Sequence, residues 1–130
     1  MRFGAAPNIS TKKAVRMALA GLGALDHVAV RVEDPDALTK FLTEVLGVER
    51  RGTETRRLFG LPGGVTLAVF PVGANQGGIG DRSGTRLPDH LALHVDSLDG
   101  VRKHLAAHGY AMDGDMVAAP GGLVLQFVRA

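Results

Sequence analysis

Hydrophobic and polar positions alternate along residues 27–32. Valine occupies every second position from 28 to 32, and the positions between carry His27, Ala29 and Arg31. Successive side chains of a β-strand point to opposite faces of a sheet. The alternation therefore predicts a strand with one face in the core and one face that carries polar groups.

Helical spacing follows this strand. Pro35 and Asp36 precede apolar residues spaced three and four apart, and Gly47 follows them. The apolar residues are Ala37, Leu38, Phe41, Leu42, Val45 and Leu46. This pattern predicts a helix that begins after Pro35 and ends at Gly47. Three short strands are expected next, at about 48–52, 56–60 and 64–71.

The whole pattern occurs twice. Residues 25–42 read LDHVAVRVEDPDALTKFL, and residues 88–105 read PDHLALHVDSLDGVRKHL. The identical pairs are Asp26/Asp89, His27/His90, Ala29/Ala92, Val32/Val95, Asp36/Asp99, Lys40/Lys103 and Leu42/Leu105. Glycine pairs at 63–64 and 121–122 also align, at a smaller offset, so the second copy is shorter in its middle. Its strands are expected at about 110–113, 115–118 and 122–128, after a helix that contains Val101 and Leu105.

These copies predict an α+β domain over residues 25–130. Two tandem βαβββ modules, at 25–72 and 88–130, are expected to form a cupped mixed sheet with the helices on the outside. Residues 73–87 are rich in glycine and polar residues, which is typical of a flexible linker; a mobile flap over the site is the alternative.

Residues 1–24 are expected to be an N-terminal extension. Ser10 is suited to cap a short helix over about 11–20, which Gly21 would end. The basic character of this segment also resembles that of a signal or transit peptide, and translation from Met17 is a third possibility.

Composition narrows the classes of function. The 130 residues include no cysteine, which excludes disulfides, thiolate zinc sites and cysteine nucleophiles. A net charge of +2 with 5% aromatic residues argues against nucleic-acid binding. No apolar run is long enough to span a membrane, so we expect a cytoplasmic protein without a membrane partner. The GGIG segment at 77–80 does not lead from a strand into a helix, so a phosphate-binding loop is not supported.

Polar residues recur on equivalent strand faces of the two copies. If the modules pair about a pseudo-twofold axis, these faces line one cup. The first strands contribute His27, Ala29 and Arg31, and His90, Ala92 and His94. The last strands contribute Thr66, Ala68 and Phe70, and Val124, Gln126 and Val128. A mid-strand amide such as Gln126 needs a hydrogen-bonding partner, whereas His104 and His108, four apart on the second helix, are interpreted as surface residues.

The segments LDHVAVRVEDPDALTKFLTEVLGVE and PDHLALHVDSLDGVRKHLAAHG resemble the vicinal oxygen chelate superfamily. That superfamily includes glyoxalase I, bleomycin-resistance proteins, fosfomycin-resistance enzymes, extradiol dioxygenases and methylmalonyl-CoA epimerase. The resemblance covers about residues 25–130 and implies a homodimer. It also implies a metal site built from the first and last strands of each module, which places His27, Ala68, His90 and Gln126 at the ligand positions.

The four positions depart from the family pattern at two places. Ala68 cannot ligate a metal and is assigned to substrate contact, and Gln126 stands where a carboxylate is usual. The resemblance therefore implies a divalent ion (Fe, Mn, Co, Ni or Zn) held by His27, His90 and Gln126. A neutral amide offsets less of the charge of the metal than a carboxylate does, so its affinity should be low.

Two functions remain open. The first is a metal-dependent lyase, isomerase or ring-cleaving dioxygenase that acts on a small, oxygen-rich, metal-chelating substrate. His94 would then be the candidate base. Arg31 would bind a substrate carboxylate or phosphate, although its guanidinium could instead reach solvent. The second is a metal-free protein that binds or sequesters a small molecule, of the bleomycin-resistance type.

Overall fold

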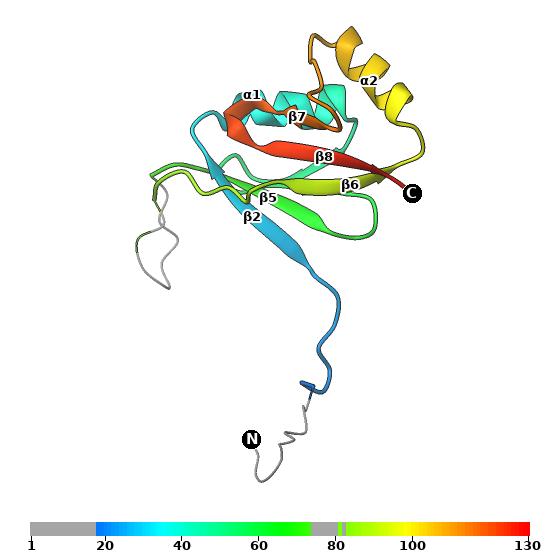
Figure 1. Cartoon of the computed structure of the whole chain (residues 1–130). Helices are drawn as coiled ribbons and strands as arrows, with labels where there is room; N and C mark the ends of the chain where they lie inside the picture. Colours follow the sequence, from blue (N-terminus) through cyan, green and yellow to red (C-terminus); the bar gives the residue numbers. More distant parts are fainter. Residues whose placement is uncertain (1–17, 74–80, 82) are drawn as a thin grey trace.

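Two sheets, one from each copy of the repeat, make up the protein. The computed structural model describes residues 18–73, 81 and 83–130 (Figure 1). The first copy forms β2 (His27–Val32), α1 (Pro35–Lys40), the π-helix η1 (Phe41–Val45), β3 (Glu49–Gly52), β4 (Arg57–Gly60) and β5 (Thr66–Pro71). The second forms β6 (Leu91–Val95), α2 (Leu98–Ala107), β7 (Met116–Ala118), the 3-10 turn η2 (Pro120–Gly122) and β8 (Val124–Arg129). The α+β fold of tandem modules expected from the sequence is confirmed.

The two sheets share one connectivity. Their strand orders are β2-β5-β4-β3 and β6-β8-β7, and in each the first strand of the copy lies parallel to the last. The register is also repeated, because Ala29 pairs with Ala68 in the first sheet and Ala92 pairs with Gln126 in the second. Residues that align in the sequence repeat therefore occupy equivalent places in the two sheets.

The strand expected at 110–113 does not form. The backbone N–H of Tyr110 instead donates to the carbonyl of Leu105, within the last turn of the second helix. The Tyr110 ring packs edge-on against Phe41 of the first module, with 4.8 Å between the ring centroids. The only pairing here is between Asp113 and Met116, within a tight turn. The second copy is shorter in its middle, and its residues there form this turn and this ring contact instead of a strand. Its sheet therefore has three strands, whereas that of the first copy has four.

Most of the expected N-terminal helix lies outside the described residues. Its described part, residues 18–20, is not helical. Residues 74–80 and 82 of the expected linker also lie outside the described residues, so the choice between linker and flap stays open there. Among the described residues, no helix is both long enough and apolar enough to cross a membrane.

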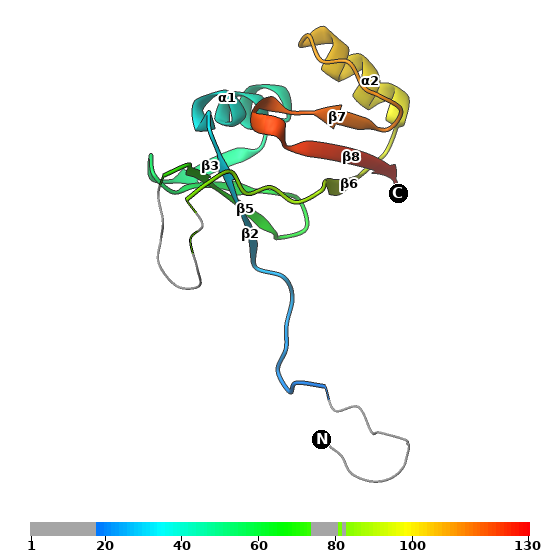
Figure 2. The ribbon, with the colours of Figure 1, turned by 60° about the vertical axis from the view of Figure 1, so that its left-hand side comes forward.

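A single hydrophobic core joins the modules on the faces that carry the helices. Val30 and Val32 are at most 1% exposed, which confirms that the valine face of β2 is buried. Leu38 and Phe41, on α1 and η1, join the same core as Leu123, Leu125 and Phe127 of the second module. Figures 1 and 2 show α1 lying over the first sheet, beside η2 and the start of β8. The opposite faces of both sheets are left for other contacts.

Candidate functional site

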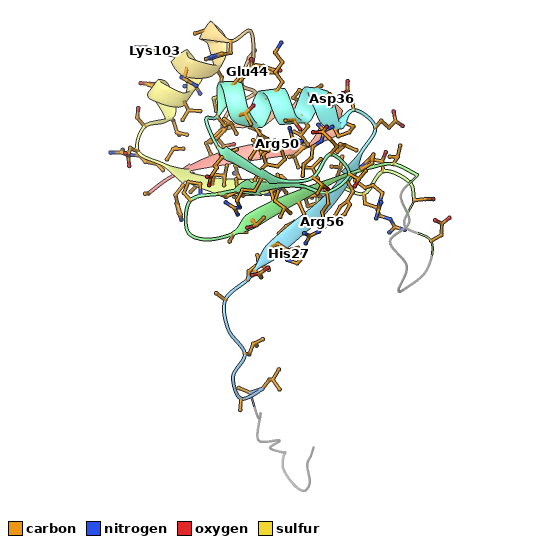
Figure 3. All side chains as sticks on the ribbon, turned by 180° about the vertical axis from the view of Figure 1, so that it is seen from behind. His27, Asp36, Glu44, Arg50, Arg56 and Lys103 are labelled. Carbon is orange, nitrogen blue, oxygen red and sulfur yellow. The ribbon has the colours of Figure 1, made fainter. Side chains whose placement is uncertain are left out.

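Two of the predicted ligand positions lie on the polar face of the first sheet, and one is exposed to solvent whereas the other is buried. His27 and Ala29 are exposed on β2, beside Thr66 and Ala68 of β5. Figure 3 shows His27 at the start of β2, on the side of the sheet away from α1. Ala68 is 1% exposed. Since it also has no donor atom, this position offers nothing to a metal.

Each of the two predicted histidine ligands is hydrogen-bonded to the aspartate before it. The Nδ1 of His27 lies 2.8 Å from Oδ2 of Asp26, and the Nδ1 of His90 lies 2.7 Å from Oδ2 of Asp89. A carboxylate on one ring nitrogen fixes the tautomer and leaves Nε2 as the ligating or accepting atom. The Asp-His dipeptide, present at the same place in both copies, is the sequence signal for these partners, and sequence reasoning did not assign them this role.

Gln126 has the hydrogen-bonding partner that its place in the strand demands. Its Nε2 donates to Oδ2 of Asp115 over 3.0 Å. The expectation of a partner is confirmed, but Asp115 was missed because it lies in the irregular turn before β7. The bond uses the amide nitrogen, so Oε1 is the atom left to accept from a ligand.

The predicted metal ligands are divided between the sheets. His27 begins β2 of the first sheet, whereas Gln126 lies on β8 of the second sheet and His90 immediately precedes β6 of that sheet. Within the described part of the chain, no group of three or more His, Asp or Glu side chains could hold a metal ion. The described residues therefore do not present a cluster of histidine and carboxylate side chains that fits a tightly held divalent metal.

Arg31 is buried. It is 6% exposed, and its Nη1 donates to the carbonyl of Pro71 over 3.4 Å, while its guanidinium carbon lies 5.3 Å from the centroid of the Phe70 ring. Its backbone exchanges two hydrogen bonds with Arg86, of 2.9 and 3.0 Å. The alternative that places its guanidinium in solvent is wrong, because these contacts hold the residue where β2 meets the segment leading to the second module. Its contact with a substrate stays a prediction.

Arg51 is a further cation on the polar face of the first sheet. Its Nη2 donates to Oγ1 of Thr66 over 3.4 Å, and its Nη1 donates to Glu49 over 3.1 Å. The side chain crosses β4 at Gly60, where a Cβ would lie 2.9 Å from Nη1. Sequence reasoning missed Arg51, although the register that pairs it with Leu58, itself paired with Ala68, places it on this face.

His94 is exposed, as are His104 and His108, which confirms the surface interpretation of the last two. His104 has an additional contact, because its Nε2 donates to the carbonyl of Val45 over 2.6 Å. This bond joins α2 to the end of η1 in the other module. The role of His94 as a base stays a prediction.

A large cleft lies between the modules, on the helix-bearing side. Its volume is about 870 Å³, which is within the range of small-molecule pockets. Apolar side chains dominate its lining, with Leu25 and Val28 on one side and Leu91, Leu93 and Val101 on the other. The lining also includes Ala92 and His94, so at β6 the cleft reaches the polar face of the second sheet.

Comparisons with known proteins agree with this architecture. A lactoylglutathione lyase from Agrobacterium tumefaciens superposes with a TM-score of 0.65 at 16% identity, over 85% of this chain and 96% of that one. TnmS3, an antibiotic binding protein from Streptomyces sp. CB03234, gives a TM-score of 0.66 at 17% identity, over 85% and 98%. An integron cassette protein from the mobile metagenome of V. cholerae gives 0.68 at 19% identity, over 86% and 98%. At these identities the likeness shows the fold alone.

No curated protein sequence matches the chain significantly. The family model described as Glyoxalase/Bleomycin resistance protein/Dioxygenase superfamily matches residues 24–128, which include every strand and helix of both modules except the last residue of β8. The chain therefore belongs to the glyoxalase/bleomycin resistance protein/dioxygenase superfamily.

Proposed function

We propose that this chain binds a small molecule without a metal, on the polar sheet faces that carry His27 and His90. The observation that carries the proposal is the state of the other two ligand positions. Ala68 has no donor atom and is 1% exposed, and Gln126 is a neutral amide tied to Asp115. A divalent ion held by neutral imidazoles needs an anionic ligand to offset its charge, and neither position supplies one.

The polar groups on these faces suit an organic ligand. His27 and His90 each present Nε2 with the tautomer set by an aspartate, and Gln126 presents Oε1. Ala29 and Ala92 are small and exposed, and leave room beside them. A ligand that combines a flat apolar body with several hydrogen-bonding groups matches this set. The antibiotic-binding neighbour of the same fold supports a role of this kind.

A homodimer is part of this proposal. The two faces lie on different sheets of one chain, and a second copy offers a way to bring both histidines into one site. A second copy that sets its second sheet against the first sheet of its partner would combine His27 with His90 and Gln126. Binding and dimerisation would then be linked.

A metal-dependent enzyme is the second candidate. It is favoured by the two Asp-His pairs, since metal-binding imidazoles commonly donate their other ring nitrogen to a carboxylate. His27, His90 and Gln126 would be the ligands. This set carries no negative charge, and its members come from two different sheets, which is why the candidate ranks second.

Elemental analysis and ligand binding decide between the candidates. The untagged protein, purified without chelator, is analysed beside the double variant His27→Ala, His90→Ala, and then titrated calorimetrically with Zn²⁺, Mn²⁺ and Ni²⁺. A panel of aromatic polar compounds and antibiotics is screened by thermal shift with and without EDTA. We expect no stoichiometric metal, and at least one compound whose stabilisation is unaffected by EDTA and absent in the double variant.

His108→Gln serves as the matched control, because His108 is an exposed histidine that immediately follows α2 and lies on neither the first nor the last strand of a module. It should bind every compound like the parent protein. Near-stoichiometric metal that is lost from the double variant and kept by the control would overturn the metal-free proposal and establish the second candidate.

A further inference from the structure

A row of residues in register crosses the polar face of the first sheet. Glu49 of β3 pairs with Gly60 of β4, which in turn pairs with Thr66 of β5. Thr66 pairs with His27 of β2. Neighbouring strands of a sheet lie about 4.8 Å apart, so the row leads in short steps from the edge strand β3 to one of the histidines of the proposed binding face.

Arg51 directs its charge inward, along this row. It lies on the edge strand β3, from which a long side chain can reach solvent without crossing the sheet. Its guanidinium instead reaches β5, on the far side of β4, where Nη2 donates to Oγ1 of Thr66 over 3.4 Å while Nη1 donates to Glu49 over 3.1 Å. The side chain is 47% exposed, and a guanidinium carries more N–H donors than the two acceptors that Arg51 has among the described residues. Part of its hydrogen-bonding capacity is therefore accessible to a ligand.

Gly60 provides the space that this crossing needs. A Cβ at Gly60 would lie 2.9 Å from Nη1 of Arg51, and the three atoms nearest to it all belong to that guanidinium. The backbone of Gly60 does not have the positive φ that requires glycine. Glycine inside a strand weakens the strand and often marks a place where another group approaches closely. At Gly60 the approaching group is a cation, which is thereby held over the face of the sheet and beside Thr66.

We propose that Arg51 recognises an anionic group of the ligand, and that the ligand is an aromatic carboxylate. This inference rests on the proposed function, because it names the class of molecule that the same face binds. A planar guanidinium pairs with a carboxylate through two parallel hydrogen bonds. Thr66 accepts from Arg51 and still has its own O–H to donate to the same carboxylate. The small, exposed Ala29, two residues after His27 on β2, leaves room for the aromatic ring.

Two compounds that differ only in charge test this proposal. The dissociation constants of 2-naphthoate and 2-naphthamide are measured by calorimetry in the presence of EDTA. We expect the parent protein to bind the carboxylate about tenfold more tightly than the amide, because hydrogen bonds between ionised partners are stronger than neutral ones. Arg51→Gln should abolish this preference by weakening the binding of the carboxylate alone.

Arg50→Gln is the matched control. Arg50 precedes Arg51 on the same strand and also pairs with a carboxylate, since its Nη2 donates to Glu54 over 2.7 Å. It lies on the opposite face of the sheet, because it is paired with Phe59, which is fully buried in the core. This variant removes one positive charge from β3 and should keep the full preference for the carboxylate.

Gly60→Ala separates the position of the guanidinium from its charge. The added Cβ would displace the far end of the Arg51 side chain, which is flexible, so the protein should remain folded with an unchanged circular dichroism spectrum. The charge is kept, but the guanidinium no longer lies beside Thr66. We expect the preference for the carboxylate to fall about threefold, which is the effect of a misplaced rather than a missing hydrogen-bonding group.

The outcomes distinguish this proposal from the binding function on which it rests. Equal affinities of the parent for both compounds, or a preference that survives Arg51→Gln, would overturn the proposal and leave metal-free binding standing. Arg51 would then serve to keep the edge strand from pairing with another sheet. If the parent binds neither compound the proposal is also overturned, and the panel of aromatic compounds and antibiotics decides the binding function separately. Stoichiometric metal together with a preference that depends on Arg51 would overturn only the metal-free function.

Discussion

Arg57 donates from Nη2 to Oδ1 of Asp36 over 2.7 Å, and this bond ties β4 to the first turn of α1. The Arg57 side chain is 7% exposed, whereas that of Asp36 is 86% exposed. Glu54 and Thr39 accept further hydrogen bonds from the same guanidinium. A buried cation is thus held by two carboxylates that are themselves exposed to water and by a half-buried threonine.

This asymmetry predicts that removing the partners costs more than removing the cation. Arg57→Met keeps an unbranched side chain in place and frees exposed carboxylates, so unfolding free energy should fall by about 1 kcal/mol. Asp36→Ala, Glu54→Ala leaves the guanidinium buried with fewer acceptors, and should lower the free energy of unfolding in urea by more than Arg57→Met does. Asp99→Ala is the control, because Asp99 is the equivalent carboxylate in the first turn of α2. Its loss of stability is subtracted from that of the double variant, to remove the contribution of a carboxylate at a helix start. A larger loss in Arg57→Met than in the corrected double variant would contradict this account.

Glu54 should make stability depend on pH in the acid range. The hydrogen bond from Arg50, the charge of Arg50 and then the charge of Arg57 lower its pKa below the ordinary value of 4.5. A carboxyl whose pKa is lower in the folded state contributes stability above its unfolded pKa, and that contribution is lost as pH falls through 4.5 and below. The melting temperature of the parent should therefore fall more steeply on acidification than that of Glu54→Gln. The difference should shrink in high salt, since the group is exposed; parallel curves at low salt would refute it.

Gln126 and Asp115 predict the effect of restoring the usual family carboxylate. Gln126→Glu removes the donor of a 3.0 Å hydrogen bond and places two carboxylates together, so about 2 kcal/mol of stability should be lost at pH 8. The loss should diminish at acid pH, when the pair shares a proton, and on addition of a divalent ion. Gln126→Met removes the donor without adding charge and should lose less at pH 8. Equal losses in both variants at all pH values would show that the charge of the pair is unimportant.

The features that could be predicted from the sequence are those with a local period. Alternation identified the buried valine face of β2, and the duplicated pattern identified the two equivalent modules, because both can be recognised from the order of residues along the chain. The place of Gln126 in the sheet was predicted in the same way, together with its need for a partner.

The features that were missed depend on contacts between segments distant in sequence. Tyr110 lies outside any strand and packs on Phe41, 69 positions earlier in the sequence. Arg31 is buried where its backbone forms hydrogen bonds with Arg86. His27 and His90 belong to different sheets. These sheets are held together through a shared core that contains Leu38 of α1 together with Leu123 and Phe127. No periodic signal reports which faces of two modules pack together, so the ligand set could be named from the sequence but not assembled.

The paired glycines allow the repeat itself to be tested. Gly63 and Gly121 are equivalent positions with φ of +90° and +84°. A Cβ at Gly63 would meet nothing within 4 Å, whereas one at Gly121 would lie 3.3 Å from Cβ of Val32, which is fully buried. Alanine in the left-handed conformation costs about 1 kcal/mol at either site. Gly121→Ala should lose about 2 kcal/mol, because Val32 cannot yield within a packed core. Gly84→Ala, with an ordinary φ and open space, should leave the unfolding free energy unchanged. If Gly63→Ala and Gly121→Ala are equally destabilised in urea, then η2 does not press on β2 as closely as the structure indicates, and the two modules are joined mainly through α1.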